Sequence, residues 1–182
     1  MLTPPILTPL VTPPNERYNI NGPVTLADGC SGTIPWTSKD WLGYKGTDCI
    51  LYIDLEKETE INEIKIGWLN DVSSWIYEPN KEVEIYIGND TNNLIAIRDS
   101  SLMYRNPTED TTVTYTVPWH IPQTTLKDFP DGNIIENGYS FSSLKGKGRY
   151  IKLVIKNFGI IPEGKPGAGK RAWLFLDEIG VY

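Results

Sequence analysis

Apolar and polar residues alternate along much of this chain, with the period of strands that have one buried face. In RYIKLVIKN (149–157), Ile151, Leu153 and Ile155 share one face, and two lysines point away from it. In AWLFL (172–176) both faces are apolar, which predicts a strand that lies centrally in a sheet or between layers. We expect these two strands to form a closing hairpin around a loop rich in glycine, proline and lysine.

Asp177 and Glu178 directly follow the second of these strands. Neighbouring residues of a strand point to opposite faces of its sheet. We therefore expect that the two carboxylates are not both buried on one side and do not act as a catalytic pair.

Strand signals elsewhere bring the expected count to about eight. The remaining strands are predicted at 49–55, 61–70, 82–88, near 94–98, at 111–117 and at 139–142. The charged stretch EKETE (56–60) is predicted to be the turn between the first two. KDWLGYKGTD (39–48) and VSSWIYEPN (72–80) are predicted to be loops with aromatic side chains, and VTLADG (24–29) a short extended piece that leads into a turn.

Helix content is expected to be low, because no segment shows a sustained period of about 3.6 residues with capping residues. Short strands separated by turn signals are typical of an all-β fold. The pattern predicts an antiparallel sandwich or a jelly roll.

The 182 residues fit one domain. Six prolines in residues 1–23 predict a linker or a first edge segment, which leaves 24–182 for the domain. The stretch at about 89–138 is expected to contain a long polar excursion. The first residues have neither the basic head nor the apolar core of a signal peptide, so an exported parent protein would carry its signal outside this chain. No apolar run approaches the roughly 20 residues of a membrane span.

The net charge of −6 is unevenly distributed along the chain. Residues 145–171 contain eight basic side chains and one acidic side chain, a net charge of +7, which leaves −13 for the rest. A mostly acidic surface argues against nucleic acid or an anionic membrane as the main partner. The basic segment either lines a binding surface or consists of solvated strand faces and a loop.

Several kinds of catalytic chemistry lack the residues they need. The stretch from Gly164 to Lys170 has the glycine spacing of a phosphate-binding loop, but Arg171 stands where that motif needs Ser or Thr, and a strand pattern follows. His120 is the single histidine, so a multi-histidine metal site is impossible, and no nucleophile turn accompanies it. Carboxylate pairs for glycoside hydrolysis remain open, but none has a compelling context. Enzyme activity is not expected.

Cys30 and Cys49 are the two cysteines, and they lack the spacing of a zinc site. They either pair, if the fold brings their Cα atoms within about 6 Å, or remain free. We expect two free, partly buried thiols.

Three stretches taken together resemble a known family. They are RYNINGPVTLADGCSG (17–32), WLGYKGTDCILYIDLEKETEINEIKIGWL (41–69) with SWIYEP (74–79), and RYIKLVIKN (149–157) with PGAGKRAWLFLDEI (166–179). These resemble the discoidin-like, coagulation-factor type-C domains, and most closely those appended to bacterial hexosaminidases, near the family 32 carbohydrate-binding modules. The resemblance covers about residues 8–88 and 139–182. It implies a non-catalytic jelly-roll β-sandwich, often with a structural calcium, that usually holds a sugar in loops at one end.

The resemblance also implies a set of calcium ligands. Asp28 and Glu178 would supply carboxylates, Thr25 and Asp177 backbone carbonyls, and Thr33 a carbonyl or hydroxyl. Such hard oxygen donors suit Ca²⁺, which takes roughly 6–8 ligands. The alternative is that Asp28 only caps a turn and Glu178 is solvated.

A sugar site needs flat aromatic faces for the C–H face of a pyranose and polar groups for its hydroxyls. The loop candidates are Trp36, Trp41, Tyr44, Trp75, Tyr77 and Trp119, with Asp71, His120, Lys165 and Arg171 as hydrogen-bonding groups.

Some of these tryptophans have a favoured structural interpretation. Trp41 and Trp75 lie in motifs that recur as packing features in related domains, and Trp68 and Trp173 lie within strands and are predicted to be core. Related sequences often carry Trp-His before the Pro-Gly-Ala-Gly turn, where this chain has Gly and Lys. The excursion with its Trp-His pair at 119–120 is the candidate replacement.

The resulting hypothesis is a non-catalytic carbohydrate-binding accessory module of an exported glycan-degrading enzyme. It would bind galactose- or N-acetylhexosamine-type sugars and be tethered to a catalytic domain outside the cell, in the periplasm or on the surface of a bacterium. No nucleic acid partner and no membrane span are expected. The alternative is a structural or protein-interaction domain of the adhesion type, without sugar binding.

Overall fold

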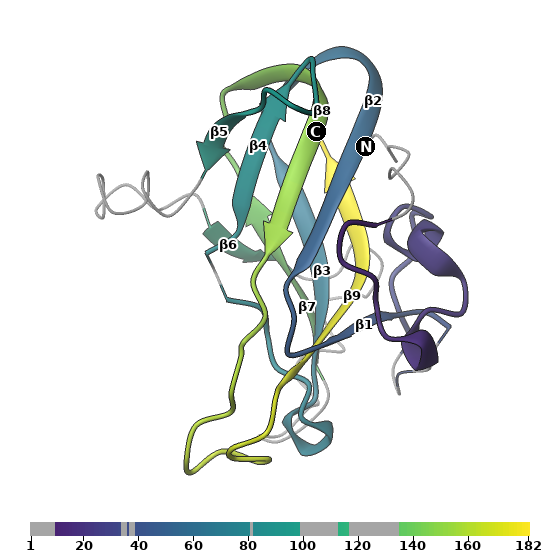
Figure 1. Ribbon diagram of the computed structural model, residues 1–182, viewed down its shortest axis with the longest axis vertical. Helices are drawn as coiled ribbons and strands as arrows, with labels where there is room; N and C mark the ends of the chain where they lie inside the picture. Colours follow the sequence, from purple (N-terminus) through teal and green to yellow (C-terminus); the bar gives the residue numbers. More distant parts are fainter. Residues whose placement is uncertain (1–9, 34–35, 37–38, 81, 99–112, 117–134) are drawn as a thin grey trace.

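Two antiparallel β-sheets face each other in the structure, a computed structural model that describes residues 10–33, 36, 39–80, 82–98, 113–116 and 135–182 (Figure 1). One sheet has the order β1–β9–β3–β7–β6, formed by β1 (Leu42–Lys45), β9 (Trp173–Val181), β3 (Ile64–Asn70), β7 (Ile135–Phe141) and β6 (Val113–Thr116). The other has the order β2–β8–β4–β5, formed by β2 (Cys49–Ile61), β8 (Gly146–Ile155), β4 (Glu84–Gly88) and β5 (Ile95–Arg98).

Helix is limited, in the described residues, to three short 3₁₀ segments. These are η1 (Glu16–Tyr18), η2 (Gly22–Leu26) and η3 (Val72–Ser74). The predicted all-β antiparallel sandwich with little helix is confirmed. No helix in the described part of the chain is long and apolar enough to cross a membrane.

β8 and β9 lie in different sheets, so the predicted closing hairpin is wrong. β8 pairs with β2 and β4, whereas β9 pairs with β1 and β3. The loop between them passes from one sheet to the other at the lower end of the view in Figure 1. The reason is that each strand finds partners from distant parts of the chain. The central position predicted for β9 is confirmed.

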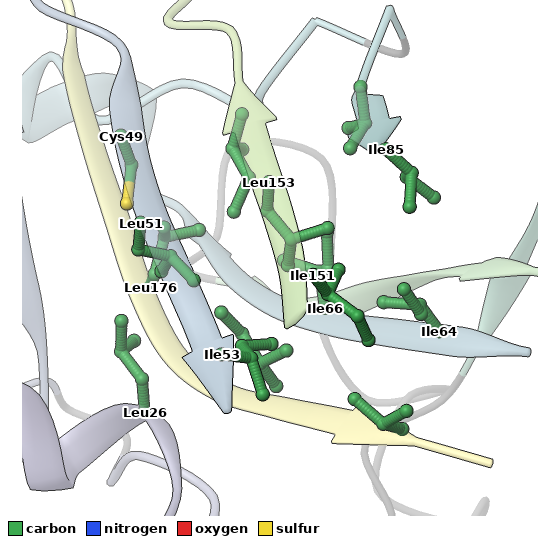
Figure 2. Packing of buried hydrophobic residues seen from close by; sticks show 14 of the residues in the cluster. Leu26, Cys49, Leu51, Ile53, Ile64, Ile66, Ile85, Ile151, Leu153 and Leu176 are labelled. Carbon is green, nitrogen blue, oxygen red and sulfur yellow. The ribbon is translucent and has the colours of Figure 1, made fainter. Parts of the chain in front are cut away.

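The core lies between the two sheets. Ile151, Leu153 and Ile155 of β8 are each 0% exposed, which confirms the predicted buried face. Figure 2 shows apolar side chains of both sheets in one cluster, with Ile66 and Leu176 contributed by the five-stranded sheet. Burying each such side chain contributes about 1.5–3 kcal/mol, so this alternation is what holds the two layers together.

The stretch EKETE is part of β2 and not a turn. β2 runs on to Ile61, and its pairing with β8 shifts register between Asp54 and Thr59. Glu56 takes a left-handed φ of 66° in this irregularity. A bulge of this kind leaves the charged residues exposed and returns Ile61, 1% exposed, to the core. The chain turns after β2, at 62–63.

Other segments also differ from their predicted form. Residues 42–45 form β1 because they pair with β9, and Thr25 lies in η2 where an extended piece was expected. The predicted loop at 72–80 begins with η3 and then joins Asp71 and Trp173 through bridges of Ile76. The strands predicted at 82–88, near 94–98, at 111–117 and at 139–142 are confirmed as β4, β5, β6 and β7 with shifted bounds.

The Pro-rich segment packs against the sandwich from Leu10 onward. Leu10 is 8% exposed and belongs to the main buried cluster. The backbone N–H of Thr12 donates to the carbonyl of Ile50 at 3.2 Å, and that of Asn15 to the carbonyl of Gly43 at 2.7 Å. Residues 10–18 therefore follow the edge formed by β1 and β2.

The predicted excursion at about 89–138 is described only in part. The turn at 89–94, β5, β6 and the start of β7 are described, and residues 99–112 and 117–134 lie outside the described residues.

We predict that Ile151→Ala lowers the free energy of unfolding by about 2–5 kcal/mol, because it removes buried methyl groups and leaves a cavity. Ile95→Ala is the matched control, since Ile95 is 71% exposed, and should change it by less than about 0.5 kcal/mol. Urea denaturation of both variants measures the difference. Equal losses in the two variants would contradict this placement of the core.

Candidate functional site

Two adjacent carboxylates in β9, Asp177 and Glu178, are both buried, at 2% and 0% exposure. The ladder between β3 and β9 shifts register beside them, so the strict alternation of side chains is interrupted here. Glu178 Oε2 accepts a hydrogen bond from the backbone N–H of Gly29 at 2.9 Å, and Asp177 Oδ2 accepts one from Gly32 at 2.8 Å. Both carboxylates therefore accept hydrogen bonds from the loop at 29–32. The prediction that they are not both buried on one side is wrong.

Gly67 of β3 makes room for Asp177. A Cβ atom at position 67 would lie 2.1 Å from Asp177 Oδ1, far inside van der Waals contact. Glycine within a strand often marks such a close approach. The hydrogen bond from Gly32 to the carboxylate of Asp177 therefore depends on glycine, which has no side chain, at position 67.

Glu178 lies in an environment that disfavours its charge. Burial and the negative charge of Asp28 raise the pKa of Glu178 to about 7. Among the described residues, Glu178 Oε1 has no hydrogen-bond partner, and neither has the buried hydroxyl of Thr25 in η2, a segment that contacts β9. The alternative interpretation of a solvated Glu178 is wrong.

The remaining predicted metal ligands lie on or beside the same loop. Asp28 is exposed, and its Oδ1 accepts the N–H of Cys30 at 2.9 Å, which is the turn-capping contact of the alternative interpretation. Thr33 donates its hydroxyl to Asp40. No three His, Cys, Asp or Glu side chains of the described residues are placed to hold a metal ion together. A cation here would need backbone or hydroxyl oxygens besides the two carboxylates.

Two of the predicted sugar-binding aromatics are buried. Tyr44 lies in β1 at 1% exposure, where strand pairing with β9 turns it into the core, and burial raises the pKa of its phenol. Tyr77 is 3% exposed, its ring stacks on Phe158 at 4.7 Å between centroids, and its hydroxyl donates to the carbonyl of Pro166 at 2.8 Å. Neither ring offers a face to a ligand, contrary to their assignment as ligand-binding residues.

The tryptophans divide into a buried and a partly exposed set. Trp41 and Trp68 are 0% and 3% exposed, so both have the packing role predicted for them. Trp36, Trp75 and Trp173 are partly buried. Trp173 is therefore less enclosed than the predicted core position, because β9 begins at the loop end of its sheet.

Trp36, Trp75 and Trp173 form what we call the aromatic group. The ring of Tyr18 connects two of them, with centroids 5.8 Å from Trp36 and 5.0 Å from Trp173. The backbone N–H of Trp173 donates to the carbonyl of Trp75 at 2.8 Å. Three segments far apart in the sequence thus bring partly exposed indoles to one end of the sandwich.

Asp71 is a fixed part of this end and not a free hydrogen-bonding group. It is 3% exposed, and its Oδ2 accepts from Trp36 Nε1 at 3.1 Å while its Oδ1 accepts from the hydroxyl of Ser73 at 2.6 Å. Although burial opposes them, hydrogen bonds from Ser73, Ser74 and Trp36 lower the pKa of Asp71. The ionised carboxylate orients the indole of Trp36.

Trp75 is held by the Pro-Gly-Ala-Gly turn. Its backbone has a left-handed φ of 63°, which costs a non-glycine residue about 1–3 kcal/mol. A Cβ atom at Gly167 would lie 2.4 Å from Trp75 Cδ1, so the turn passes directly against the indole. Lys170 Nζ lies 3.6 Å from the centroid of the same ring. The loop that carries Trp75 and the loop that carries Gly167 and Lys170 therefore pack against each other.

Four exposed cations lie at these tryptophans or in the loop that leads to Trp173, and we call them the basic rim: Lys45, Lys165, Lys170 and Arg171. Two of them, Lys165 and Arg171, are the predicted polar ligands. Lys170 could have been found from the turn that carries it, whereas Lys45 faces Trp173 only through strand pairing, which the sequence does not reveal.

The three lysines of the basic rim lie near aromatic rings. Lys45 Nζ lies 5.3 Å from the ring centroid of Trp173, and Lys165 Nζ lies 5.9 Å from that of Tyr77. Arg171 packs its aliphatic part against Gly46, where a Cβ atom would lie 2.8 Å from Arg171 Cβ. Within the described residues, none of the four cations forms an ion pair.

The other candidates are placed as follows. Trp119 and His120 lie outside the described residues. The thiols of Cys30 and Cys49 are free, the first exposed and the second buried. β9, and no helix, follows the loop with the phosphate-binding spacing, in agreement with its exclusion.

The sequence matches no family model and no curated protein. Solved structures do resemble the chain, and they include CBM32 modules, the group named by the sequence resemblance. CpGH89CBM32-6 of Clostridium perfringens aligns over 100% of this chain and 94% of its own, at 14% identity and a TM-score of 0.47. A fucose binding module of Streptococcus pneumoniae, SpX-3, aligns over the same shares at 14% identity and a TM-score of 0.46.

A third similar structure is the C-terminal domain of a chitobiase from Bacteroides fragilis. It aligns over 98% of this chain and 97% of its own, at 16% identity and a TM-score of 0.42. Likeness at these identities and scores does not indicate a ligand, so the function has to be sought in the residues of this chain.

We predict a pH-dependent stability that depends on Glu178. Its pKa is about 7 when folded against an ordinary value of 4.5, so between these values the folded state binds more protons than the unfolded state. Stability therefore falls as the pH rises from about 4.5 to about 7, by up to roughly 3 kcal/mol. Urea denaturation in EDTA at pH 5 and pH 8 should show this fall, and Glu178→Gln should remove most of it.

Glu163→Gln is the control, because Glu163 is exposed and its loss leaves β9 unchanged. The control should keep the fall in stability. If Glu178→Gln and the unsubstituted protein lose the same stability between the two pH values, the assignment to Glu178 is wrong.

Proposed function

We propose that this chain is a non-catalytic carbohydrate-binding module that accompanies an exported glycan-degrading enzyme of a bacterium. The observation that carries the proposal is the aromatic group, in which Trp36 and Trp173 both contact Tyr18 and Trp75 is joined to Trp173 through a backbone hydrogen bond. Indoles with part of their surface exposed suit the C–H face of a pyranose ring. Exposed Lys165 and Arg171 supply donors for sugar hydroxyls.

The aromatic group is fixed before any ligand binds. Asp71 holds the indole nitrogen of Trp36, and the Pro-Gly-Ala-Gly turn holds Trp75. Trp173 is part of a strand that pairs on both sides. A preorganised site loses little conformational entropy when a ligand binds, which supports weak but useful affinity for small sugars. Galactose- and N-acetylhexosamine-type sugars are the proposed ligands.

An accessory module acts by tethering. A catalytic domain linked to it would meet its glycan at a raised effective concentration even when a single sugar binds weakly. This role requires location outside the cell, in the periplasm or on the cell surface, next to the polymer. The competing proposal, a structural or protein-interaction domain of the same fold, requires no sugar binding at all.

We predict that galactose- or N-acetylhexosamine-type sugars bind with a Kd on the order of 10⁻⁴ M, about −5 kcal/mol, in calorimetric titration. Trp173→Phe should weaken binding about five-fold or more, because the smaller ring covers less of the sugar. Trp68→Phe is the matched control in the same sheet, since Trp68 is 3% exposed and buried in the core, and should leave affinity unchanged.

The outcomes separate the two functions. Absence of binding by any neutral or charged sugar at millimolar concentration would contradict the carbohydrate-binding proposal and favour the structural one. Equal loss of affinity in both tryptophan variants would show that the sugar does not bind at the aromatic group.

We also propose a structural Ca²⁺ held by the carboxylates of Asp28 and Glu178, the carbonyls of Thr25 and Asp177, and an oxygen of Thr33. Glu178 Oε1 supports the proposal, because it is buried without a hydrogen-bond partner among the described residues. These residues are hard oxygen donors of the kind Ca²⁺ prefers. When bound, the ion would supply the positive charge that the two carboxylates lack.

The side chains of this site already connect the loop at 28–33 to β9. Asp177 accepts the N–H of Gly32 with its carboxylate, and we propose that its backbone carbonyl is the oxygen that binds the cation. Glu178 uses one carboxylate oxygen for Gly29 and leaves the other. A cation between these groups would strengthen this attachment by adding positive charge beside the carboxylates.

We predict that 1 mM CaCl₂ raises the Tm of EDTA-treated protein, since a ligand at about 100 times its Kd stabilises the folded state by about 2.7 kcal/mol. Glu178→Gln should abolish this increase and the exposed control Glu163→Gln should keep it. Differential scanning calorimetry measures the shift. An unchanged Tm in the unsubstituted protein, or a full shift in Glu178→Gln, would refute the calcium site.

A further inference from the structure

We propose that the basic rim makes this sugar site select acidic glycans, in which a carboxylate or sulfate replaces or modifies a sugar hydroxyl. This inference rests on the proposed function and names the ligand class of the same site. Its basis is the position of Lys45 at Trp173 and of Lys170 at Trp75, with Lys165 and Arg171 exposed in the same loop as Lys170.

The loop end that carries the basic rim is positively charged, whereas the chain as a whole is negatively charged. The whole chain carries a net charge of −6, yet the loop from Pro162 to Arg171 contains Lys165, Lys170 and Arg171 against the single carboxylate of Glu163. Lys45 adds a further cation from β1. A local positive patch on an acidic molecule raises the concentration of small anions at that patch.

The cations of the basic rim can each still bind an anionic group. In the described residues none of the four forms an ion pair, although Lys147, Arg149 and Lys156 of the four-stranded sheet do. Lys45 and Lys170 lie instead over the faces of Trp173 and Trp75. An ammonium group over an aromatic face is held more weakly than one that donates charge-assisted hydrogen bonds to a carboxylate. An acidic sugar would therefore improve the contacts of these lysines.

The cations also lie where a sugar would put its substituents. Lys45 and Lys170 are each placed at one of the indoles that would contact the pyranose ring. A pyranose ring stacked on either indole would displace the lysine from that face, and the displaced ammonium group could then bind an acid group of the same sugar. Each of these two indoles is thus paired with a cation, a combination that suits a ligand with one apolar face and an anionic group.

The loops that carry the rim are restrained. The backbone N–H of Gly169 donates to the carbonyl of Ile161 at 2.8 Å, and that of Ile161 donates to the carbonyl of Lys170 at 2.9 Å. The backbone N–H of Gly46, next to Lys45, donates to the carbonyl of Ala172 at 2.8 Å and so connects this residue to the same loop. Because the backbone is held, binding has to order mainly the lysine side chains.

A small acidic glycan fits this end better than an anionic membrane. Membrane insertion needs large apolar side chains at the loop tip, and Pro162 to Arg171 contain none. Of the large apolar side chains that are exposed in the described residues, only Ile160 belongs to the loop between β8 and β9. An extended anionic surface would also approach the remaining acidic part of the chain, whereas a short oligosaccharide contacts the rim alone.

The test uses two ligands that differ only at C6, which carries a hydroxymethyl group in one and a carboxylate in the other. Calorimetric titration compares galactose with galacturonate, and their β-linked or α-linked oligomers of equal length, at 50 and 300 mM NaCl. We expect galacturonate to bind at least ten-fold more tightly at low salt, with the ratio falling at high salt as screening increases. A sulfated galactose distinguishes a general anion preference from one for carboxylates.

Lys45→Gln/Lys165→Gln/Lys170→Gln should reduce the galacturonate-to-galactose affinity ratio to about one. Lys57→Gln/Lys145→Gln/Lys147→Gln is the matched control, because it removes the same charge from three exposed lysines outside the rim, and it should keep the ratio. Thermal unfolding of both variants checks that each is folded.

The result that overturns the inference is equal affinity for the neutral and acidic sugars, or a ratio that survives in the rim variant. Binding of galactose without preference leaves the proposed function in place and removes only the selection of acidic glycans. Absence of binding by both sugars removes both. Binding to vesicles containing phosphatidylserine, without binding to galacturonate, would replace the glycan by a membrane and overturn the inference as well.

Discussion

The close approach of β3 and β9 at Gly67 is the constraint on which the candidate calcium site depends. Because position 67 has no side chain, the carboxylate of Asp177 fits between the strands and accepts the N–H of Gly32. Gly32 in turn lies against the indole of Trp41, where a Cβ atom would be 2.2 Å from Trp41 Cε2. One missing side chain in the sheet therefore determines how the loop at 28–33 lies, and this loop leads directly to Trp36.

The sugar-binding end depends on a second close approach, between Gly167 and Trp75. The turn that contains Gly167 has a positive φ of 83° at this residue, so a larger residue would be strained as well as too close to the indole. The same turn places Lys170 over the ring. The position of a cation and the orientation of an aromatic face are thus set by one backbone conformation, and neither can change without the other.

The sequence predicted correctly the features that depend on residues close together along the chain. It failed for features that depend on pairing with distant strands. Alternation placed the buried face of β8 correctly, because Ile151 needs only its own strand period to face the core. The hairpin of β8 and β9 was wrong, because pairing is a long-range property. Tyr44 was expected at a binding surface, yet pairing of β1 with β9 buries it. The register shift that brings Asp177 and Glu178 to one loop depends on Gly67 of another strand and has no signal in the local pattern.

The two candidate sites share β9 but should act independently. Trp173 and Glu178 are five residues apart, which at about 3.3 Å per residue is roughly 17 Å along the strand. At this distance, and with Lys45 and Lys170 exposed to water, the direct Coulomb interaction with a charge at Glu178 is small. Any coupling would have to pass through the structure, by way of the loop at 28–33 and Trp36. The electrostatics of the rim and the stability of the sandwich are therefore separable properties of one strand.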